Sequence, residues 1–61
     1  MKLLYDKTAA AEALSTSERR IDELRRAGLL NAVQDGREFK FTLEELQRYV
    51  NSLPEFEPRA S

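Results

Sequence analysis

The sequence predicts a mostly α-helical domain with one small β-hairpin, in the order helix, turn, helix, hairpin, helix. Residues 9–28 predict two short helices joined by a polar turn. The Asp-Gly pair at 35–36 is a strong hairpin signal. The Thr-Leu-Glu-Glu sequence at 42–45 predicts the start of a third helix. We assign residues 1–53 to this domain and expect the Pro-containing tail, 54–61, to be disordered.

The composition bounds the class of protein. Sixty-one residues make one small domain, because a chain of this size buries only about 60% of its unfolded surface. The sequence has no Cys and no His, so we expect neither an enzyme nor a metal or cofactor site. Apolar runs fall far short of the ~20 residues of a membrane span, and no signal-peptide pattern is present. We therefore expect a soluble, intracellular protein without a membrane partner.

The first helix is expected over residues 7–14, after an apolar lead-in (residues 1–5) that packs against later elements. Asp6 is placed to cap this helix, because a carboxylate there accepts backbone N–H groups and meets the helix dipole favourably. The alanines that follow are strong helix formers. Ala10 and Ala11 are small enough to let the two helices cross closely.

The second helix is expected over residues 18–27. Leu14 ends the first helix, residues 15–16 make the turn, and Ser17 caps the second helix. Gly28 ends it, since glycine takes the left-handed C-cap conformation without a Cβ penalty.

Ile21 and Leu24 recur at helical spacing and are expected to face inward. Arg19 and Arg26 then fall on the outer face, with the acids at 22–23 beside them. Arginines in the last turn also suit the helix dipole, which by itself is a structural reason for them. The stretch is typical either of an αα-hairpin with a solvated charged face or of a helix-turn-helix that reads DNA.

Residues 29–33 and 38–41 are expected to pair as the hairpin. Asp35 and Gly36 predict a type I′ turn, which needs positive φ at both central residues. An isolated two-stranded hairpin is marginal in water, so it must pack on the helices while its tip, residues 34–37, projects outward.

Alternation predicts the faces of the hairpin. Phe39 and Phe41 alternate with polar residues, so one face is apolar and the other polar. Ala32 and Val33 are the expected cross-strand partners of the two aromatic residues.

The third helix is expected over about residues 43–53. Thr42 at the N-cap and Glu45 three residues later form a capping box, in which each side chain satisfies the other's backbone donor. Pro54 ends the helix. Its apolar stripe consists of Leu43, Leu46, Tyr49 or Val50, and Leu53.

The order of elements places the hairpin directly after the second helix, which is typical of a winged helix-turn-helix. The second helix of that fold enters the major groove, and the wing lies over phosphate or in the adjacent minor groove. The net charge of −1 argues against indiscriminate nucleic-acid binding. Residues 19–40 nevertheless carry six basic and four acidic residues (+2), whereas the remainder carries four and seven (−3).

Residues 3–53 resemble the small excisionase (recombination directionality factor) family and the DNA-binding half of MerR-type regulators. The shared outline is an apolar-Tyr lead-in, an Ala-Ala pair, a Ser N-cap followed by basic residues, Gly28, an Asp-Gly wing and an apolar-patterned third helix. In two places the chain departs from the pattern: the family commonly has Gly and an apolar residue at 15–16, and an apolar residue in place of Lys7. MerR-type regulators continue into a long dimerising helix, so a chain ending at Ser61 favours the excisionase family.

The resemblance implies a non-enzymatic architectural protein of a bacteriophage or other mobile element, acting in the bacterial cytoplasm on the nucleoid. It would bind attachment-site double-stranded DNA, bend it and direct a site-specific integrase towards excision. Several copies would bind side by side. One such module buries about 600–1,000 Å² on DNA, and each bidentate base contact discriminates by about 1–3 kcal/mol, too little to select a genomic site unaided.

The candidate DNA contacts lie in the turn, the second helix and the hairpin. Arg19 and Arg20 are the best candidates for the major groove, where Arg pairs with guanine O6 and N7. Glu23 would accept from cytosine N4 or simply pair with Arg19. Arg37 would enter the minor groove or meet phosphate, the alternative being a solvated turn residue. The remaining candidates are Thr16, Ser17 and Arg26 at phosphate, and Lys40 behind the tip.

Two other functions remain open. A small transcriptional regulator with the same winged domain would bind DNA through the same surface. A protein-interaction adaptor would keep the shape without the DNA contacts, an alternative that the near-neutral charge and the acids Asp22 and Glu23 support.

Overall fold

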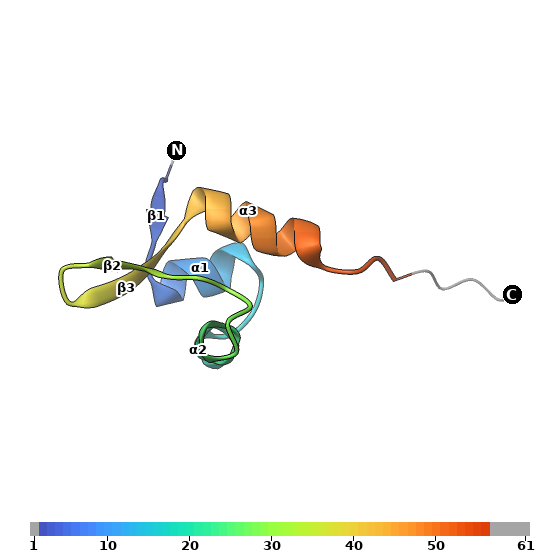
Figure 1. Cartoon of the computed structure of the whole chain (residues 1–61), viewed down its shortest axis with the longest axis horizontal. Helices are drawn as coiled ribbons and strands as arrows, with labels where there is room; N and C mark the ends of the chain where they lie inside the picture. The colour runs from blue at the N-terminus through green and yellow to red at the C-terminus, as the bar shows by residue number, and fades with distance from the viewer. Residues whose placement is uncertain (1, 57–61) are drawn as a thin grey trace, which may run out of the picture.

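The computed structural model describes residues 2–56, which form three helices and a three-stranded antiparallel sheet (Figure 1). The sheet order is β1-β3-β2, so the last strand in sequence lies in the centre. Residues 1 and 57–61, which include most of the predicted tail, lie outside the described residues. The elements are β1 (Leu4–Tyr5), α1 (Lys7–Ala13), α2 (Glu18–Arg26), β2 (Val33–Asp35), β3 (Glu38–Thr42) and α3 (Leu43–Ser52).

The ends of α1 follow local capping rules. The carboxylate of Asp6 accepts a first-turn N–H at 2.8 Å, as predicted. At the other end Ser15 adopts a left-handed conformation with φ 55°. The N–H groups of Ser15 and Thr16 donate to the carbonyls of Glu12 and Ala11, at 3.1 and 2.8 Å. This is a Schellman motif, and a serine occupies the position that glycine usually takes.

The ends of α2 confirm the predicted caps. The hydroxyl of Ser17 accepts the N–H of Arg20 at 3.1 Å. Gly28 has φ 77°, and the next N–H, of Leu29, donates to the carbonyl of Leu24 at 2.9 Å. The helix therefore ends one residue earlier than predicted, in a second Schellman motif.

Only half of the predicted capping box forms at α3. The N–H of Glu45 donates to the hydroxyl of Thr42 at 3.0 Å. The carboxylate of Glu45 does not return to the N-cap; it accepts from Arg48 and from the N–H of Asn31. A charged guanidinium is a stronger donor than a neutral amide and holds the carboxylate elsewhere. Pro54 follows the last residues of the helix, as predicted.

The first strand of the hairpin is shorter than predicted. Residues 29–32 form a loop, because they follow the C-cap of α2 and carry Leu30 into the core, where it is 0% exposed. The predicted pairing of Val33 with an aromatic residue, and of Phe39 with Ala32 or Val33, is also wrong. Phe39 lies opposite Gln34, and Val33 lies opposite Lys40.

The turn type differs from the prediction as well. Asp35 pairs with Glu38, so Gly36 and Arg37 are the two central residues of the turn. Gly36 has φ 66°, whereas Arg37 does not have positive φ. Positive φ at a glycine in the first central position is the requirement of a type II′ turn, not of type I′.

The predicted apolar lead-in contributes a strand of its own. Leu4 and Tyr5 pair with β3, opposite Thr42 and Phe41 respectively. Two residues are too short a run for alternation to reveal a strand. The hairpin is therefore one part of a larger sheet, and β3 is paired on both sides.

The core lies where the three helices meet β3. The close approach of α1 and α2 that small residues predict is confirmed, since Ala10 and Ala11 are fully buried at their crossing. The stripe of α3 is only partly covered, because Leu46 is buried while Val50 and Leu53 are about half exposed. No helix within residues 2–56 is long and apolar enough to cross a membrane. The buried side chains are Ala10, Ala11, Ile21, Leu24, Leu30, Phe41 and Leu46.

Candidate nucleic-acid interface

The outer face of α2 presents arginines to solvent. Ile21 and Leu24 are buried, which fixes the rotation of the helix about its axis. Arg19 and Arg26 therefore point away from the core, as helical spacing predicts. The side chain of Arg19 is 89% exposed, and Arg26 is also exposed. Nothing in the described part of the chain covers this face.

Glu23 lies between two of the candidate arginines. Its carboxylate lies 3.5 Å from Arg19 Nε and 3.5 Å from Arg20 Nη1, so the predicted ion pair is present. Exposed pairs at this spacing are worth about 0.3–0.5 kcal/mol each. A bidentate contact between Arg and guanine discriminates by about 1–3 kcal/mol. The ion pairs are therefore weak enough to exchange for base contacts.

Arg20 and the turn lie on a different flank of α2 from Arg26. Arg20 and Thr16 line a hollow with Tyr49 and Val50 of α3. Ser17, next to this hollow, is exposed but engaged as the N-cap. The structure thus brings Thr16, Ser17 and Arg20 together at the start of α2, on the side that faces the end of α3.

The hairpin meets α2 on the opposite flank. The guanidinium of Arg25 lies over the ring of Phe39, 4.8 Å from its centroid. Asp22 lies 4.0 Å from Arg25 Nη2 and 3.2 Å from Lys7 Nζ. Phe39 is not in the core beside Phe41, as its alternation suggests, but is 53% exposed. It lies nearer the tip than Phe41, at the side of α2 that carries Asp22 and Arg25.

Asp22, Arg25 and Phe39 are the residues of this surface that the sequence interpretation missed. The helix dipole by itself explains the last-turn position of Arg25, and alternation places Phe39 on the apolar face of the hairpin. The signal in the sequence is an aromatic residue two positions after Arg37, in a hairpin that follows an arginine-bearing helix.

The two basic candidates of the hairpin differ in their surroundings. Arg37 is exposed at the turn. Lys40 lies 3.0 Å from a carboxylate oxygen of Asp35 and 3.5 Å from one of Glu38, and its side chain is only 26% exposed. The hydrogen bond that Lys40 donates to the carboxylate of Asp35, together with the negative charge of that carboxylate, raises the pKa of Lys40. Since successive strand residues point to opposite faces, Lys40 lies on the face away from Phe39 and from α2.

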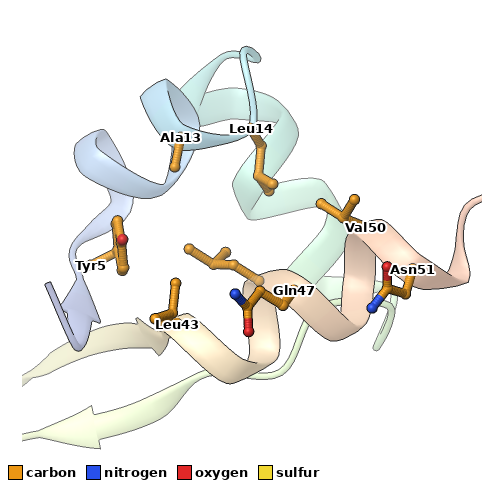
Figure 2. A pocket seen from close by; sticks show the side chains of 8 residues that line it. Tyr5, Ala13, Leu14, Leu43, Gln47, Val50 and Asn51 are labelled. Atoms are coloured by element: carbon orange, nitrogen blue, oxygen red, sulfur yellow. The ribbon is translucent and has the colours of Figure 1, made fainter. Parts of the chain in front are cut away.

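An apolar hollow of about 380 Å³ lies between α1 and α3 (Figure 2). Tyr5, Leu14, Leu43 and Val50 line it together with two amide side chains of α3. Within residues 2–56, no three acidic side chains gather where they could hold a metal ion. The polar groups of the hollow are the phenol of Tyr5 and the amides of Gln47 and Asn51.

The fold and this surface define a small α/β domain with an exposed, arginine-bearing helix flanked by a hairpin. Comparisons with protein-family models, with curated proteins and with solved structures find no match to this chain.

Proposed function

We propose that the chain is a winged helix-turn-helix DNA-binding protein in which α2 enters the major groove and the hairpin acts as the wing. The main support for this proposal is the contact between Arg25 and Phe39, because it connects the hairpin to α2. Arg19, Asp22 and Arg26 follow one another at i, i+3 and i+7 and so form one stripe along α2. Asp22 in this stripe lies next to Arg25, and Arg25 contacts Phe39 of the hairpin. The hairpin therefore lies beside the helix face that carries Arg19 and Arg26.

The proposed division of roles follows from exposure and charge. Arg19 is the candidate for base readout, with Arg20 and Glu23 beside it. Arg26 in the last turn of α2 and Arg37 in the hairpin turn are phosphate candidates, and so are Thr16 and Ser17 at the start of the helix. Lys40 has its charge matched by two hairpin carboxylates, so its contribution is the weakest of the set.

We further propose an excisionase-type role, which the resemblance of residues 3–53 supports. In this proposal several copies bind attachment-site DNA of a mobile element, bend it, and direct an integrase towards excision. The near-neutral charge is consistent with binding by several adjacent copies, because a single copy has few cations with which to contact DNA phosphates.

Selection of duplexes from a random library tests DNA reading. We expect the wild-type chain to enrich a motif and Arg19→Ala to lose preference at one or two of its positions. Lys2→Ala is the matched control, because it removes one positive charge next to β1, which lies across α1 from α2 (Figure 1). Absence of any gel shift by the wild-type chain at low salt would contradict the proposal and favour the adaptor.

A recombination assay tests the narrower role. We expect excision between the element's attachment sites by its integrase to rise when the protein is added. If the protein binds these sites and excision does not change, the excisionase role is wrong and a transcriptional regulator takes its place.

A further inference from the structure

We propose that Arg25 and Phe39 are positioning residues, which hold the hairpin at a fixed angle to α2 before any DNA is bound. Asp22 orients Arg25 for this contact. The consequence for DNA binding depends on the function proposed above. The restraint on the hairpin in the free protein does not depend on that function, because it follows from the contacts of Arg25 with Phe39 and Asp22 alone.

The distal half of the hairpin needs such an anchor. All three residues of β2 are exposed, and the buried residue of β3 is Phe41, at the end away from the turn. A two-stranded ribbon is marginally stable by itself in water. Phe39 lies between Phe41 and the turn, and its ring meets a helix at Arg25. This contact therefore ties the projecting part of the hairpin to the body.

The side chain of Arg25 is restrained by contacts with Phe39 and Asp22. Its guanidinium has the ring of Phe39 on one side, 4.8 Å from the centroid, and a carboxylate oxygen of Asp22 at 4.0 Å. The other oxygen of Asp22 lies 3.2 Å from Lys7 at the start of α1. Only 31% of the Arg25 side chain is exposed, against 89% for Arg19. Arg25 thus joins α2 to β3, and its partner Asp22 joins α2 to α1.

A fixed hairpin lowers the ordering cost of binding. A cation–π contact at an exposed site is worth about 0.5–1 kcal/mol, which corresponds to about a two- to fivefold change in affinity. We expect a loss of this size when the contact is removed.

Distance measurement on the free protein tests the positioning itself. The chain has no Cys, so Arg37→Cys and Ser52→Cys give two unique sites for spin labels, on the hairpin and on α3. We expect a narrow distance distribution in this background by pulsed electron paramagnetic resonance. Adding Phe39→Leu or Arg25→Lys should broaden it, because the first removes the ring and the second removes the planar guanidinium while keeping the charge.

Two controls separate positioning from general loosening. Arg26→Lys makes the same chemical change one residue away on the exposed face and should leave the distribution narrow. Phe39→Tyr keeps the ring and should do the same. Circular dichroism checks that each variant is folded. Distributions that stay equally narrow with Phe39→Leu and with Arg25→Lys would overturn the proposal.

A double-mutant cycle tests the consequence for DNA. We expect Phe39→Leu to weaken binding two- to fivefold when Arg37 is present and to have little effect in the Arg37→Ala background. Equal losses in both backgrounds would show that Phe39 does not act by positioning the tip. If the wild-type chain binds no DNA, the proposed function fails, and the distance measurement still decides whether the hairpin is held.

Discussion

The carboxylate of Glu45 accepts the backbone N–H of Asn31 at 2.9 Å, across fourteen positions of sequence. Arg48 donates to the same carboxylate and also to the carbonyl of Leu29, each at 2.9 Å. The segment held in this way carries Leu30 into the core and leads from α2 into the hairpin. The first turns of α3 therefore determine where the hairpin begins.

Glu45→Gln should destabilise the fold by about 1–3 kcal/mol, because a charged acceptor of three donors is replaced by a neutral amide. Urea denaturation followed by circular dichroism measures the change. Glu44→Gln is the matched control, since Glu44 is an exposed neighbour in the same helical turn and should change stability by less than about 0.5 kcal/mol. Equal effects of the two substitutions would mean that the Glu45 contacts contribute no stability.

The stability that Glu45 provides should depend on pH. The hydrogen bond from Arg48, and then that from Asn31, lower the pKa of Glu45 to about 2, against 4.5 without these contacts. Because the folded pKa lies below the unfolded one, the unfolded chain binds more protons between these values. The contribution is therefore complete above about pH 4.5 and is lost as the pH falls towards 2. The stability difference between wild type and Glu45→Gln, measured from pH 7 to pH 2.5, should shrink only below pH 5; a constant difference would contradict this.

Ser15→Gly should stabilise the protein, because Ser15 has φ 55° and glycine adopts that conformation without a steric penalty. The left-handed region costs other residues about 1–2 kcal/mol, which glycine does not incur. Glycine loses more backbone entropy on folding, so the net stabilisation should be about 0.5–1 kcal/mol. The shift of the thermal midpoint measures it. Ser15→Ala is the control, since alanine shares the steric penalty and should not raise the midpoint. A rise with alanine as well would exclude the backbone explanation.

Arg37→Ala should weaken binding to most duplexes with little change in sequence preference. If Arg37 neutralises one phosphate, the slope of log K against log salt should become shallower by about 0.9. Fluorescence anisotropy over a range of salt concentrations measures the slope. Lys2→Ala serves again as the charge-matched control and should leave the slope unchanged. A slope that Arg37→Ala does not alter would remove Arg37 from phosphate contact.

Capping residues were predicted well because a cap involves groups within a few residues of one another. Asp6, Ser17 and Thr42 each accept a backbone N–H three residues further on, and Gly28 ends α2 in the left-handed conformation. Helical spacing likewise predicted that Arg19 and Arg26 face solvent, since the burial of one stripe determines the direction of the other.

Contacts between distant segments could not be predicted in this way. Local alternation places Phe39 on the apolar face of the hairpin, but how much of its ring is covered depends on the elements that pack against that face. The ion pairs of Lys40 depend on a register that places Asp35 opposite Glu38. The strand at Leu4 exists only because β3 offers it a partner.

Local sequence was sufficient for the three helices, their ends and the outward direction of the arginines, because backbone geometry and capping involve residues within about one turn. Packing between segments decided the length and register of the hairpin, the third strand and the contact of Arg25 with Phe39. Those features depend on which side chains the core has room to bury, and that space is defined only when all the elements are assembled.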